Sequence, residues 1–136
     1  MALSKKGEVE ALADALVGSA DAIHDRIVKE IGRRKLKQFQ AYSLFRDETS
    51  LRVKANALYL EAVTLTVSDL ELAQTDLMKV INKATSQIKT IKTIAAFVDL
   101  VADLLVLAAA AYAAKPGPII SALDEVRMDI GEQVEG

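Results

Sequence analysis

Residues 70–112 read LELAQTDLMKVINKATSQIKTIKTIAAFVDLVADLLVLAAAAY. An apolar side chain recurs every seven positions in this segment, at Leu70, Leu77, Ala84, Ile91, Val98, Leu105 and Tyr112. This spacing indicates a helix that buries one continuous stripe. No glycine lies between Arg33 and Lys115, and the first proline is Pro116. We therefore expect an all-α bundle of four to six helices around one long, central apolar helix over about residues 69–114.

The number of helices within residues 50–114 stays open. The segment is either one helix or is broken near residue 68 or within 85–93, and the capping-box pattern of residues 68–71 is one possible helix start. Residues 51–67 contain alternating apolar positions, among them Val63, Leu65 and Val67, which would suit a strand. We favour a helix there, because residues 57–62 break the alternation and no turn residues divide two strands.

The flanking segments predict further helices. Apolar positions spaced by three and four residues run from Val9 to Ile31, and Gly32 is expected to end or kink that helix. From Leu36 to Phe45 we expect either a second, shorter helix or a bent continuation of the first, with turn and cap residues at 47–50. The sequence Lys115-Pro116-Gly117-Pro118 is a clear break, after which a short helix closes the bundle. Residues 1–136 are expected to form a single domain, with 1–3 and 131–136 frayed.

Composition restricts the class of protein more than its function. The chain has 136 residues, of which 51% are hydrophobic and 4% aromatic, and a formal net charge of −2. Nucleic acid is an unexpected partner because the chain is not basic overall. No cysteine is present, which excludes disulfides and thiolate chemistry. The first residues have no hydrophobic signal core, so we expect a cytoplasmic protein or one exported without a cleaved signal.

The sequence contains no recognisable catalytic or cofactor-binding motif. His24 is the only histidine, and a lone imidazole without thiols makes a transition-metal site improbable. The six glycines are too dispersed to form a phosphate-binding loop. We therefore expect no enzyme, no cofactor and no metal.

Charged residues supply the candidate interaction positions. Asp99 and Asp103 share one face of an otherwise apolar segment, and they either mark its solvent side or pair with basic residues of a neighbouring helix or subunit. Basic residues form two clusters, one from Arg26 and Lys29 to Lys37 and one from Lys79 and Lys83 to Lys92. The candidate interaction positions within them are Arg33, Arg34, Lys35, Lys37, Lys89 and Lys92. Solvated faces explain most such clusters, but an acidic partner or anionic lipid would also fit. The acidic segment 8–25 is a plausible complement for the lysines of 79–92.

Residues 94–114 are long enough to span a bilayer. Two aspartates near the centre cost about 2.5–3.5 kcal/mol each, more than the nearby Leu, Ile, Val and Phe residues recover at about 0.3–0.6 kcal/mol each. A buried bundle helix is therefore the better interpretation. The function we expect is a non-enzymatic helical interaction module that acts by protein–protein association, with self-association as its expected form. The alternative is a membrane-active protein, pore-forming or toxin-like, that uses residues 94–114.

Overall fold

The computed structural model describes residues 1–135, with side chains through Gly131. Five helices follow one another: α1 (Lys6–Gly32), α2 (Gln38–Leu60), α3 (Gln74–Thr90), α4 (Ile94–Ala113) and α5 (Pro116–Glu135). Within residues 1–135 there is no strand, so the strand alternative for 51–67 is wrong and the all-α class is confirmed. The fraying expected for residues 131–136 falls almost entirely outside the residues whose side chains are described.

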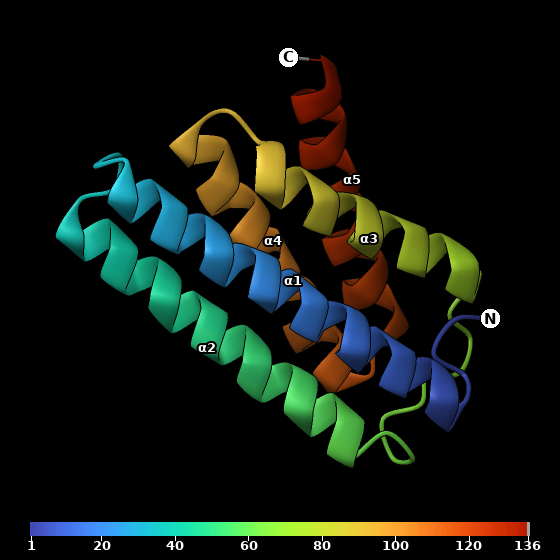
Figure 1. Ribbon diagram of the computed structural model, residues 1–136. Helices are drawn as coiled ribbons and strands as arrows, with labels where there is room; N and C mark the ends of the chain where they lie inside the picture. The colour runs from blue at the N-terminus through green and yellow to red at the C-terminus, as the bar shows by residue number, and fades with distance from the viewer. Residues whose placement is uncertain (136) are drawn as a thin grey trace.

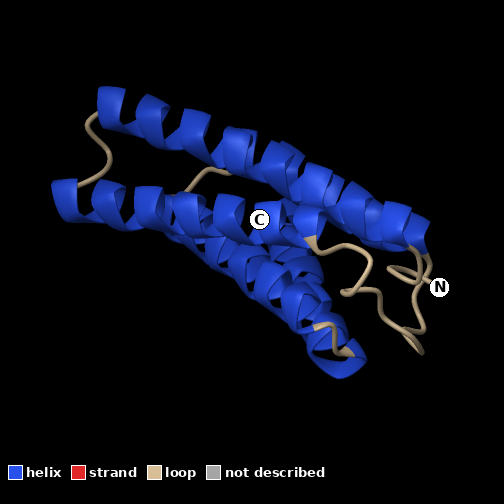
Figure 2. Cartoon of the chain, turned by 90° about the horizontal axis from the view of Figure 1, so that it is seen from below, coloured by secondary structure: helices blue, strands red, loops and turns tan. Residues whose placement is uncertain are grey.

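The five helices form two layers (Figure 1). Helices α3, α1 and α2 lie side by side, with α1 in the middle, and α4 and α5 pack behind them. Helix α4 contacts α2 and α5, and α5 also contacts α3. The N-terminal segment and the α2–α3 loop lie together at one end of the bundle (Figure 2), whereas the α1–α2 and α3–α4 links lie at the other.

The segment 69–114 holds two helices rather than one, so the open alternative of breaks near residue 68 and within 85–93 is the one that the structure has. Residues 61–73 form a loop, and α3 begins at Gln74 rather than at the capping-box pattern of 68–71. The chain leaves the helical conformation again at 91–93, where Ile91 and Thr93 have extended backbone angles. Thr93 then starts α4, because its hydroxyl oxygen accepts a hydrogen bond from the backbone N–H of Ala96 at 3.2 Å.

The break at 91–93 changes which side chains of the seven-residue repeat are buried. In α3 the repeat positions Leu77 and Ala84 lie in the core, as does Ile91 just beyond it. In α4 the repeat position Val98 is exposed, and the adjacent residue Phe97 is buried instead. The core side of α4 consists of Phe97, Leu100, Val101, Leu104, Leu107, Ala108, Ala110 and Ala111. One continuous stripe would need one continuous helix, so the break shifts the buried face.

Helix α2 is longer than the sequence pattern predicts. It runs through residues 47–50, where a turn was expected, and ends at Leu60. Glu48 lies within this stretch and is buried, so its position is set by contacts with α1 rather than by local turn preference. Gly32 ends α1 as predicted, and α5 starts at Pro116 inside the predicted break.

The first three residues are held in place, contrary to the expected fraying. Ala2 and Leu3 are almost completely buried. The N–H of Ala2 donates to the carbonyl of Leu72 at 2.6 Å, and the N–H of Val67 donates to the carbonyl of Leu3 at 2.8 Å. These backbone bonds tie the N-terminus to the α2–α3 loop and satisfy polar groups that burial would otherwise leave unpaired.

The end of α4 provides a test of the fold. Ala114 has φ 55° and ψ 38°, the left-handed conformation that glycine adopts without steric cost. We predict that Ala114→Gly raises the free energy of unfolding by about 1 kcal/mol, measured by urea denaturation. The same substitution at Ala109, an exposed position inside α4, should lower it by about 1 kcal/mol. Equal effects at the two positions would contradict the left-handed conformation of Ala114 at the end of α4.

Candidate functional site

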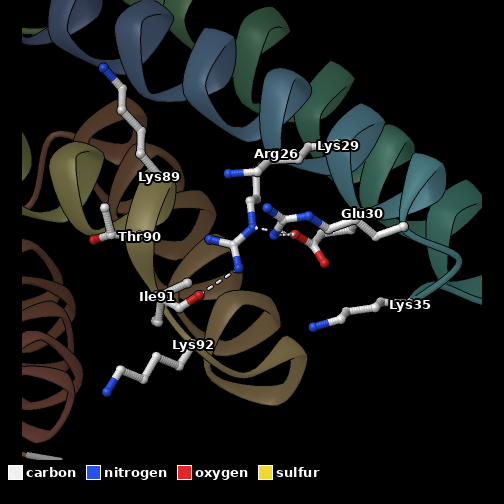
Figure 3. A pocket seen from close by; sticks show the side chains of 9 residues that line it. Arg26, Lys29, Glu30, Lys35, Lys89, Thr90, Ile91 and Lys92 are labelled. Atoms are coloured by element: carbon white, nitrogen blue, oxygen red, sulfur yellow. Dashed lines mark hydrogen bonds and ion pairs between the residues drawn. The ribbon is translucent and has the colours of Figure 1, made fainter.

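A basic pocket of about 390 Å³ lies between the C-terminal ends of α1 and α3 (Figure 3). Six of its nine lining residues are lysine or arginine, and one is acidic. The lining residues are Arg26, Lys29, Glu30, Arg33, Lys35, Lys89, Thr90, Ile91 and Lys92. We call this site the basic pocket.

Arg26 forms the floor of the basic pocket and is fully engaged by the protein. Its guanidinium is buried and donates to the carbonyl of Ile88 at 2.8 Å, to the carbonyl of Ile91 at 2.5 Å and to Oε1 of Glu30 at 3.1 Å. The group also lies 5.6 Å from the ring centroid of Phe97, at the start of α4. Arg26 therefore satisfies carbonyls at the end of α3 that the helix itself leaves without partners.

Glu30 is the only acidic side chain in the pocket lining. It is almost completely buried, and its Oε1 accepts hydrogen bonds from Arg26 and, at 3.3 Å, from Arg33. The carboxylate is thus shared between two guanidinium groups. It leaves no strong negative charge to compensate the lysines around the pocket.

Four lysines contribute positive charge that no other described residue pairs. Lys29, Lys35, Lys89 and Lys92 are all exposed, and none is in an ion pair within residues 1–131. Lys29 and Lys89 lie in the last turns of α1 and α3, where cations interact favourably with the helix dipole. Each position is locally reasonable, but the packing of α1 against α3 brings the four charges together. A neighbouring hollow of about 340 Å³ shares Arg26, Lys29 and Lys89 and adds Asp25.

The structure brings together four of the six predicted basic positions. Arg33, Lys35, Lys89 and Lys92 line the basic pocket, whereas Arg34 and Lys37 do not. Arg26 belongs to the first basic cluster of the sequence but was not one of the candidate interaction positions, and Glu30 was not predicted at all. A signal for Arg26 was present, because it lies three residues after the buried Ile23 and thus on the apolar face of α1.

The acidic segment 8–25 and the lysines of 79–92 lie on neighbouring helices, but they do not form the predicted ion pairs. Helices α1 and α3 are neighbours, but no ion pair joins these two sets of charges among the described residues. The ion pair that Asp21 of α1 forms is with Arg52 of α2, at 2.8 Å. His24 also faces α2, with its Nδ1 2.8 Å from Oε1 of Glu48.

Asp99 and Asp103 form no ion pair with a described residue, and Asp103 lies near two carboxylates of α5, Glu125 and Asp129. Burial first, and then the neighbouring carboxylates of Asp129, Glu125 and Asp99, raise the pKa of Asp103 to about 8. Oδ2 of Asp103 is buried without a hydrogen-bond partner. We call Asp99, Asp103, Glu125 and Asp129 the acidic row. The described residues contain no group of His, Cys, Asp or Glu side chains arranged to hold a metal ion.

Helix α4 is long and apolar enough to cross a membrane by length and composition alone, a test that core helices of soluble proteins also pass. In its most apolar window 44% of the residues are buried. Its inner face, with Phe97, Leu100 and Leu104, supplies the centre of the core. Insertion of α4 into a bilayer would therefore require the bundle to open, and the membrane-active alternative stays a prediction.

Comparison with known proteins supplies no relative from which a function could be transferred. No protein-family model, no curated protein and no solved structure matches this chain. Function is therefore inferred from the residues and their geometry.

The role of Arg26 can be tested by stability measurements. Arg26→Ala would leave the carbonyls of Ile88 and Ile91 without their donor and would remove one of the two partners of Glu30. We expect the free energy of unfolding to fall by about 3 kcal/mol, since breaking a buried ion pair leaves an uncompensated charge. Lys29→Ala, on the exposed side of α1, should change it by less than about 0.5 kcal/mol. If Arg26→Ala has a similarly small effect, the hydrogen bonds of Arg26 to the carbonyls of Ile88 and Ile91 do not stabilise the fold.

The acidic row predicts a pH dependence of stability. The folded-state pKa of Asp103 is raised from 3.8 to about 8, so the folded protein binds this proton more tightly than the unfolded chain. Asp103 therefore contributes most stability at acidic pH, and the contribution is lost as pH rises from about 4 to about 8.

Asp103→Asn should accordingly raise the melting temperature by several degrees at about pH 9 and have little effect at about pH 4. The control Asp14→Asn, at an exposed position of α1, should change neither value. If Asp103→Asn raises the melting temperature equally at both pH values, the raised pKa of Asp103 is not the cause.

Proposed function

We propose that this protein is a non-enzymatic helical interaction module that binds an anionic group of its partner in the basic pocket. The observation that carries the proposal is the convergence of Lys29, Lys35, Lys89 and Lys92 around a pocket with one, already shared, carboxylate. Unpaired cations that line a concave surface attract anions and raise their local concentration. The chemistry shared by the possible ligands is an exposed carboxylate or phosphate.

The construction of the pocket supports binding rather than a purely solvated charged face. Arg26 and Glu30 fix the ends of α1 and α3 relative to one another through buried hydrogen bonds. The lysine stems are therefore attached to a rigid base, so that a ligand need not order the backbone on binding. Arg33 holds its guanidinium against Glu30 and adds a planar donor at the rim of the pocket.

The proposal can be tested by calorimetric titration of the full chain with a hexaglutamate peptide and, separately, with inorganic phosphate. We expect binding at about 50 mM salt that weakens as ionic strength rises, because exposed charges are screened. Tighter binding of the peptide would indicate an acidic protein partner, and tighter binding of phosphate a phosphorylated one.

The double variant Lys89→Ala/Lys92→Ala should weaken binding about tenfold, which corresponds to about 1.4 kcal/mol. The matched control is Lys79→Ala/Lys83→Ala, which removes the same amount of charge from exposed positions of α3 outside the pocket. If the two variants lose the same affinity, the loss is explained by net charge alone and a specific pocket is refuted. Absence of binding by the unmodified protein to either probe would refute the proposed function.

A further inference from the structure

We propose that the anionic group received by the basic pocket is the acidic row of a second copy of this chain. This inference rests on the proposed function and specifies its partner. It follows from the presence, on one molecule, of two unpaired surfaces of opposite charge that are built from different helices.

The acidic row is formed by two pairs of carboxylates on adjacent helices. Asp99 and Asp103 are four residues apart on α4, and Glu125 and Asp129 are four residues apart on α5, so each pair shares a helix face. The two faces meet along the contact between α4 and α5. Asp99 and Glu125 are exposed, whereas Asp103 and Asp129 are half-buried.

The acidic row has no counter-charge of its own. The charged groups that act on Asp103 are Asp129, Glu125 and Asp99, all of them acidic. None of the four carboxylates is in an ion pair with a described residue. Like charges at this spacing repel one another, so the acidic row is stabilised by any cation that approaches it.

The basic pocket offers the complementary set of charges. In the proposed contact, the four lysines of the pocket without ion pairs face the carboxyl groups of the acidic row, among which Asp103 keeps its proton at neutral pH because its pKa is raised to about 8. Two opposite charges 4 Å apart attract by about 1 kcal/mol in bulk water and by about 4 kcal/mol in the lower effective dielectric near a protein surface. Contact between the two surfaces would therefore relieve the repulsion within each of them.

The surroundings of the acidic row permit the close approach of another chain. The exposed side of α4 next to Asp99 carries Val98, Ala102, Val106 and Ala109, without a further charge. Small apolar side chains let a partner come near without steric obstruction, and their burial adds to the attraction. The contact either closes a two-fold dimer, in which each copy uses both surfaces, or continues head to tail.

Sedimentation velocity of the full chain tests this inference. We expect self-association at about 50 mM NaCl that is lost at about 500 mM, where the Debye length is only a few ångströms. Both a dimer and a longer assembly would support the proposal. A strict monomer at low salt and high protein concentration would overturn it.

Charge reversal identifies the surfaces involved. Lys89→Glu/Lys92→Glu in the pocket and Asp99→Lys/Glu125→Lys in the acidic row change exposed side chains only. Each double variant alone should self-associate at least about tenfold more weakly than the unmodified chain. An equimolar mixture of the two should associate again, because each then presents a surface complementary to the other.

The control Lys79→Glu/Lys83→Glu should leave association unchanged, and circular dichroism establishes that every variant is folded. Recovery in the mixture supports the inference, and failure of the mixture to associate overturns it. If the chain is monomeric but still binds hexaglutamate through Lys89 and Lys92, the second copy is the wrong partner and the proposed function survives. If the chain is monomeric and also fails to bind hexaglutamate, both the second copy as partner and the proposed function are refuted.

Discussion

The buried guanidinium of Arg26 is the interaction on which the rest of the structure depends. It reaches from the middle layer helix α1 to the last carbonyls of α3 and lies against Phe97 at the start of α4. Burying a charge is costly unless it is paired and its hydrogen bonds are satisfied. Glu30 and the two carbonyls meet that requirement, so one side chain fixes three helices at the point where the chain reverses.

The reversal at residues 91–93 determines both the core and the candidate site. Because α3 ends there, α4 turns a different set of residues inward than an unbroken helix would, and Phe97 rather than Val98 enters the core. The same junction brings the C-terminal ends of α1 and α3 together. The lysines that suit each helix end separately then become neighbours around one pocket.

The charge of the chain is segregated in space although its net value is small. The formal net charge of −2, which averages over the whole chain, gives no indication of a strongly charged partner. The fold instead collects lysines between α1 and α3 and carboxylates between α4 and α5. The proposed contact between copies rests on this separation, whereas ion pairs within the chain such as Arg52–Asp21 join α1 to α2.

The sequence by itself determined what depends on near neighbours in the chain: the helical class, the end of α1 at Gly32 and the break before α5 at Pro116. These features follow from apolar periodicity and from the backbone preferences of glycine and proline. The end of α3 was decided only by the tertiary structure, since the donor for Ile88 and Ile91 lies more than sixty residues earlier in the chain. The basic pocket has the same origin, because the long separation of Lys29 from Lys89 makes their proximity a result of helix packing rather than of local pattern.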